Sequence, residues 1–130
     1  MSLQDLNDRA LKISSDAADL GFDWAHPIDV LDKLAEEVDE IRQAMISGES
    51  TERIAEEVGD LYFALVNFNR KMHIDSSRAF ESGVTKFERR FNALRQYVEK
   101  SGCQIDQLSD KELDDIWQQV KKDEEKHGCQ

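Results

Sequence analysis

The chain has 130 residues, of which 39% are hydrophobic and 35% are charged, and its formal net charge is −11. This length suits one domain with a core of its own, and the hydrophobic content is too high for a disordered chain. The negative charge argues against a surface that follows a nucleic-acid backbone. An acidic protein that acts on a polyanionic substrate would need divalent cations between the two.

The sequence predicts neither a membrane protein nor a secreted one. Its longest apolar runs are far shorter than a membrane span, and no signal segment opens the chain. The two cysteines, Cys103 and Cys129, have no CxxC or CxxH partner, so they predict neither a disulfide framework nor a zinc site. We therefore expect a cytoplasmic protein with incidental thiols and with no membrane or nucleic-acid partner.

Apolar residues spaced three and four apart predict five helices, over about residues 3–20, 27–48, 50–72, 76–102 and 109–121. Pro27 can open the second helix, and Ser109 with Glu112 makes a capping box for the fifth. The apolar stripe of the second helix is Leu31, Leu34, Val38, Ile41 and Met45, and that of the third is Ile54, Val58, Leu61, Leu65 and Phe68.

This pattern predicts an all-α fold, a helical bundle of four to five helices without strands. We expect a single domain over residues 1–130, with its motifs between about 20 and 121. The charged tail, residues 122–130, is expected to fray.

Two blocks of acidic residues stand out on the second and third helices. Glu37 and Glu40 are three apart, as are Glu57 and Asp60, so each pair shares a helix face. All four directly precede a residue of the predicted apolar stripe. If the two helices form an antiparallel hairpin around Gly48, Glu37 lies level with Asp60 and Glu40 with Glu57. Four carboxylates then converge on one side of the hairpin.

Such a concentration of negative charge is costly unless cations lie within it. Ligation by oxygen alone favours Mg²⁺, with Mn²⁺ as a substitute, over zinc or copper. A di-iron bundle would need a Glu-x-x-His motif from each of two helices, and neither block has the histidine. A solvated acidic face is the plainer interpretation of a single pair, but two pairs in register about the turn favour a metal site.

Cationic side chains that could hold phosphate oxygens occur later in the chain. Lys86 and Arg90 are one turn apart on the fourth helix, and Lys121 follows Trp117 by one turn on the fifth. Each is common on helix surfaces, so alone they are weak signals.

Together, these motifs resemble the MazG family of nucleoside triphosphate pyrophosphohydrolases. The resemblance runs in order from about Leu20 to Lys121. It is carried by Gly21-Phe22-Asp23-Trp24, Glu36-Glu37-Val38-Asp39-Glu40, Glu57-Val58-Gly59-Asp60, Val66-Asn67 with Arg70, Lys86-Phe87-Glu88-Arg89-Arg90-Phe91, and Trp117-Gln118-Gln119-Val120-Lys121.

The resemblance implies an Mg²⁺-dependent enzyme that splits a nucleoside triphosphate or deoxynucleoside triphosphate into the monophosphate and pyrophosphate. A water activated by the metal would attack the α-phosphorus. The implied metal ligands are Glu37, Glu40, Glu57 and Asp60, with Glu36 orienting the water. The implied nucleotide contacts are Lys86, Arg90, Lys121, Trp117 and Asn67. The family also implies homo-oligomers, dimers or tetramers. Many of its members carry two such domains, whereas this chain has room for one.

Two other interpretations remain open at this stage. A narrower pyrophosphatase, for dUTP, a modified nucleotide or phosphoribosyl-ATP, would use the same motifs, because the metals contact the phosphates that such substrates share. A non-catalytic helical module could use the acidic face to bind a basic protein.

Overall fold

The computed structural model describes residues 1–127, which form five α-helices and one short 3-10 helix, without a strand. These elements are α1 (Leu3–Asp19), α2 (Pro27–Ile46), α3 (Thr51–Lys71), α4 (Ser76–Lys100), η1 (Ile105–Gln107) and α5 (Asp110–His127). The all-α prediction is therefore confirmed, and the predicted helix starts agree closely with the observed ones. No helix within the described residues is both long and apolar enough to cross a membrane.

The chain divides into two compact units, Met1–Ala79 and a second that begins at Phe80, and each is described by itself. The expectation of one domain over residues 1–130 stays a prediction.

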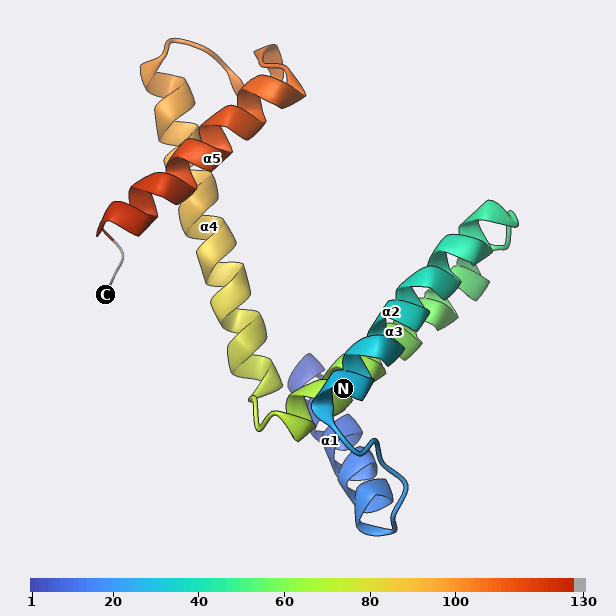
Figure 1. Ribbon diagram of the computed structural model, residues 1–130. Helices are drawn as coiled ribbons and strands as arrows, with labels where there is room; N and C mark the ends of the chain where they lie inside the picture. The colour runs from blue at the N-terminus through green and yellow to red at the C-terminus, as the bar shows by residue number, and fades with distance from the viewer. Residues whose placement is uncertain (128–130) are drawn as a thin grey trace. The chain divides into compact units, whose positions relative to one another are not determined.

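The first unit is built on the antiparallel hairpin of α2 and α3, which lie side by side in Figure 1. Gly48 makes the turn with a φ of +69°, a conformation that favours glycine. Ser50 then caps α3, because its hydroxyl accepts a hydrogen bond from the Arg53 N–H at 3.2 Å. The turn thus lies where the sequence predicted it, and α1 packs against α3.

The buried residues of the hairpin recur every seven residues on α2 and from Glu57 to Ala64 on α3, with Asn67 three residues further, and this spacing keeps one helix face toward its neighbour. On α2 the buried residues are Val30, Glu37 and Ala44, and on α3 they are Glu57, Ala64 and Asn67. Because Ala44 and Ala64 are small, the two backbones can approach closely. The seam therefore contains two glutamates, one asparagine, and only small or medium apolar side chains.

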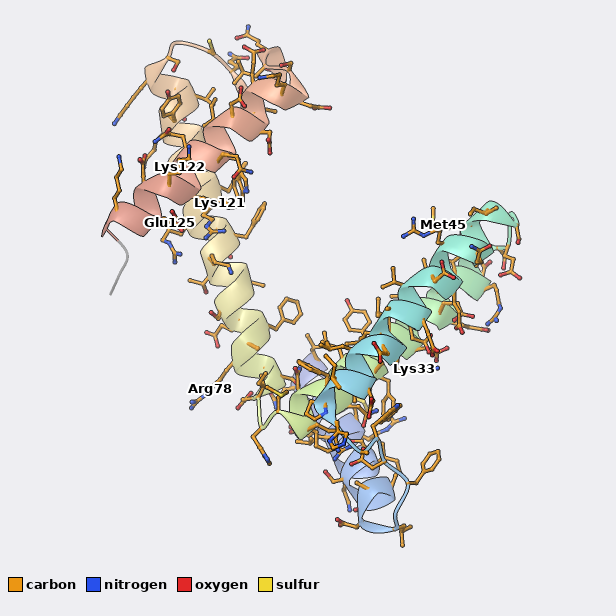
Figure 2. The ribbon with its side chains drawn as sticks, viewed as in Figure 1. Lys33, Met45, Arg78, Lys121, Lys122 and Glu125 are labelled. Carbon is orange, nitrogen blue, oxygen red and sulfur yellow. The ribbon has the colours of Figure 1, made fainter. Side chains whose placement is uncertain are left out.

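The predicted apolar core of this hairpin is confirmed only in part. Five of its residues are half-buried, namely Leu34, Ile41, Ile54, Leu61 and Phe68, but the others are exposed. Val38 and Val58 were expected to be buried, but they are 45% and 36% exposed, and Leu31 and Met45 are exposed as well. Figure 2 shows Met45 near the turn end of α2. The seam runs one residue earlier on each helix, through Glu37 and Glu57. These carboxylates therefore lie inside the helix contact, whereas the sequence placed them beside it.

The second unit holds a small core of Leu94, Val98 and Val120, against which Leu113, Ile116 and Trp117 pack from α5. The predicted capping box is confirmed: Glu112 N–H donates to the Ser109 hydroxyl at 3.1 Å, and Ser109 N–H donates to the Glu112 carboxylate at 3.0 Å.

The prediction of a frayed tail is wrong for residues 122–127, because α5 continues to His127. Its last turns are held by side-chain contacts, including a 2.9 Å hydrogen bond from Gln119 to Asp123. Residues 128–130, with Cys129, lie outside the described part, and Cys103 is a free, half-buried thiol.

Candidate active site

The α2–α3 hairpin brings three of the four predicted carboxylates together. Glu37, Glu40 and Glu57 each present one carboxylate oxygen, and these three oxygens lie within 4.8 Å of one another. Glu37 and Glu40 come from successive turns of α2, and Glu57 faces them from α3. Asp60 is exposed one turn beyond Glu57, and among residues 1–127 the cluster forms without it.

Glu37 and Glu57 are buried to a degree that is rare for charged residues. They are only 4% and 6% exposed. Within the described residues, Oε2 of each is buried and has no hydrogen-bond partner. A buried carboxylate oxygen without a partner is costly, and a cation between the carboxylates would remove that cost. These orphaned oxygens make the site fit a cation.

The donor set fits a hard divalent cation in particular. Three carboxylates supply oxygen alone, the ligand type of Mg²⁺ and Mn²⁺ in proteins, and no histidine or cysteine belongs to the cluster found among the described residues. Glu36, the expected water-orienting residue, is the exposed neighbour of Glu37 on α2.

The second oxygen of each buried glutamate is held by a cation of the same helix. Lys33 Nζ lies 3.1 Å from Oε1 of Glu37, and Arg53 Nη2 lies 2.8 Å from Oε1 of Glu57. Figure 2 shows Lys33 on α2. The hydrogen bond with Glu37 is the main reason why the pKa of Lys33 is raised. The hydrogen bond with Glu56 is the main reason why the pKa of Arg53 is raised, followed by the charge of Glu57.

Sequence reasoning missed Lys33 and Arg53, although a signal was present. Each lies four residues before a glutamate of the cluster, with the same spacing on both helices. Pairs at this spacing face one another on a helix. Such pairs are usually ordinary surface contacts, so only the burial of the glutamates distinguishes these two.

A second polar cluster fastens the linker before α2 to the end of α3. Arg70 Nη2 lies 2.6 Å from the Asp23 carboxylate, and Lys71 Nζ lies 3.0 Å from it. Lys71 also donates to the Trp24 carbonyl oxygen at 2.6 Å. The hydrogen bond from Arg70 is the main reason why the pKa of Asp23 falls from 3.8 to about 2. Two motif residues of the family resemblance, Asp23 and Arg70, thus hold the linker in place.

Asn67, predicted to contact the nucleotide, is 3% exposed in the seam. Its side-chain amide donates to the Phe63 carbonyl oxygen at 3.5 Å, and its carbonyl accepts from Arg70 at the same distance.

The predicted cationic residues lie in the second unit. Lys86 is exposed, whereas Arg90 is half-buried and its Nε donates to the Glu124 carboxylate at 2.9 Å. Arg89 Nε donates to the other oxygen of Glu124 at 3.0 Å. The hydrogen bonds from Arg89 and Arg90 lower the pKa of Glu124. That these cations face the carboxylates of the first unit stays a prediction.

Trp117 and Lys121 are half-buried on α5, where Figure 2 shows Lys121. The Trp117 ring packs against Phe87 of α4, with the centroids 5.5 Å apart and the planes tilted by 45°. Trp117 therefore helps to join α4 to α5.

The hairpin and its carboxylates fall within a stretch, residues 26–94, that matches the family model of the MazG nucleotide pyrophosphohydrolase domain. The chain belongs to this MazG family. The matched stretch contains all four predicted metal ligands together with Lys86 and Arg90, while Trp117 and Lys121 lie beyond it.

The chain is also similar to curated MazG-type proteins. It is 38% identical over 120 residues to the "Nucleoside triphosphate pyrophosphohydrolase" of Escherichia coli K12, covering 89% of this chain and 44% of the relative. It is 33% identical over 112 residues to the "Nucleoside triphosphate pyrophosphohydrolase/pyrophosphatase MazG" of Thermotoga maritima, covering 86% of this chain and 42% of the relative. The chain therefore spans less than half the length of these relatives.

Proposed function

We propose that this chain is an Mg²⁺-dependent nucleoside triphosphate pyrophosphohydrolase, which converts an NTP or dNTP and water into the monophosphate and pyrophosphate. The observation that carries the proposal is the convergence of Glu37, Glu40 and Glu57 in the hairpin, with one orphaned oxygen on each of the two buried glutamates. The names of the relatives from E. coli and T. maritima support the same reaction.

Glu37, Glu40 and Glu57 would hold the metal, and Asp60 would join them as the fourth ligand that the family resemblance implies. When bound, Mg²⁺ would supply positive charge against the triphosphate and lower the pKa of a nearby water. Glu36, the exposed neighbour of Glu37 in the sequence, would accept the proton of the water that attacks the α-phosphorus. Pyrophosphate would leave as the α–β bridging bond breaks.

Lys86, Arg90 and Lys121 would hold the phosphate oxygens, because charge-assisted hydrogen bonds to phosphate are among the strongest that side chains make. Glu124 engages Arg90 through Nε, so the two terminal amino groups of that guanidinium keep N–H donors for an anion. Trp117 packs against Phe87, and it would contact the nucleotide with the part of its ring that this packing leaves uncovered.

The proposal includes a homo-oligomer, a dimer or a tetramer. Leu31, Val38, Met45, Val58 and Leu65 are all exposed along the hairpin. Monomeric proteins rarely expose a continuous apolar stripe of this kind, and association with a second copy would bury it.

The test is a product assay with each common NTP and dNTP, with Mg²⁺ and with a chelator. We expect equal amounts of monophosphate and pyrophosphate, formed only with the metal. Release of orthophosphate as the first product, or the absence of turnover with every substrate, would contradict the proposal. Comparison across substrates also decides between a general enzyme and one narrowed to a single base or sugar.

A further inference from the structure

The two buried glutamates of the cluster share one arrangement. Each has Oε1 bound to a cation four residues earlier on its own helix, and each has a buried Oε2 without a partner. The arrangement occurs on both α2 and α3. Each glutamate therefore has one oxygen already engaged and one available.

These pairs differ from two lysine–aspartate pairs at the same spacing. In Lys12–Asp16 the side chains are 78% and 52% exposed, and in Lys111–Asp115 they are 85% and 64% exposed. Exposed pairs of this kind contribute little to stability. In contrast, the Glu37 and Glu57 side chains are 6% and 8% exposed, so in these two pairs the carboxylate is buried while its cation stays partly exposed.

We propose that Lys33 and Arg53 determine the metal selectivity of this site by reserving one oxygen of each buried glutamate. The inference rests on the proposed metal site. A carboxylate with one oxygen held by an ammonium or guanidinium group binds a metal more readily through the other oxygen than through both. Mg²⁺ accepts six ligands in a compact octahedron, whereas Ca²⁺ takes six to eight and often binds both oxygens of a carboxylate. Reserving Oε1 on two ligands therefore favours the smaller ion.

The test measures the binding of Mg²⁺ and of Ca²⁺ to the purified chain by calorimetry, without nucleotide. The variants are Lys33→Met and Arg53→Met, which keep the aliphatic stem and remove the charge. Lys111→Met is the matched control, because it removes an exposed pair far along the sequence from the cluster. Lys33 and Arg53 side chains are 38% and 49% exposed, so we expect both variants to fold, and thermal melting checks this first.

The ratio Kd(Ca)/Kd(Mg) isolates the effect, because loss of a positive charge strengthens the binding of both divalent ions alike. We expect this ratio to fall about tenfold in each variant. Loss of a side chain that holds a metal ligand in place changes metal affinity by about 10- to 100-fold, and the expected change is the lower end of that range. Lys33→Arg should restore the wild-type ratio, and Lys111→Met should leave it unchanged.

An unchanged ratio in Lys33→Met and Arg53→Met, with both ions bound more tightly, would overturn the inference and leave the metal site standing. A wild-type chain that binds neither ion would overturn the proposed metal site itself.

Discussion

Replacement of Glu40 by glutamine separates a metal site from an acidic patch that serves only stability. Glu40 is the exposed member of the cluster, and its oxygen lies within 4.8 Å of oxygens on Glu37 and Glu57. Glutamine has nearly the same shape and helix propensity as glutamate. The substitution therefore removes one negative charge and little else.

The size of the effect follows from the distance. Two unit charges 4.8 Å apart repel by about 1 kcal/mol in a medium that resembles water. Glu40 has two such neighbours, while the charge of nearby Lys33 attracts it and offsets part of the repulsion. We expect the metal-free variant to be more stable than wild type by about 0.5–1 kcal/mol, which raises Tm by about 2–4 °C.

The assay is thermal melting of both proteins in chelator and again in Mg²⁺, with calorimetric titration of the metal. In Mg²⁺ the order should reverse, because wild type gains stability by binding and the variant has lost a ligand. Glu81→Gln, an exposed glutamate early in α4, is the control and should change neither result. A Glu40→Gln variant that is less stable without metal, or that binds Mg²⁺ as wild type does, would refute the reasoning.

Three further predictions concern other parts of the chain. Asp23→Asn should lower the free energy of unfolding by about 1–2 kcal/mol at neutral pH, because the pKa of Asp23 is lowered from 3.8 to about 2. This contribution is present above about pH 4 and is lost as pH falls through 2, so the melting curves of the two proteins should converge at that pH. Arg90→Ala should lower kcat/KM about 10- to 1000-fold without weakening Mg²⁺ binding, whereas unchanged kinetics with a lower Tm would limit Arg90 to its contact with Glu124. Val38→Lys should shift the oligomer toward monomer in sedimentation equilibrium with helix content unchanged, and an unaltered mass would remove this residue from the proposed interface.

The helices could be predicted from the sequence because their signals are local. Pro27, Gly48 and the Ser109–Glu112 capping box act on the backbone within a few residues, and each lies where it was expected. The meeting of Glu37, Glu40 and Glu57 could also be predicted from the sequence, because helical spacing and the position of the turn fix which side chains can meet across a hairpin.

The rotation of the hairpin could not be read from the same pattern. Val38 and Val58 look like core residues in the sequence because they are apolar, but in the described chain the contact is made one residue earlier. An apolar stripe indicates a surface to be covered without identifying what covers it. The end of α5 was also missed, because Glu124 meets Arg89 and Arg90 from a distant part of the sequence.

The bond that is broken tests the central claim most directly. The reaction should be run in ¹⁸O-labelled water with Mg²⁺ and the best substrate of the product assay, and the products analysed by mass spectrometry. Attack at the α-phosphorus, as proposed for this MazG-family chain, places the label in the nucleoside monophosphate and leaves pyrophosphate unlabelled. Label in pyrophosphate, or labelled orthophosphate as the first product, would contradict the account.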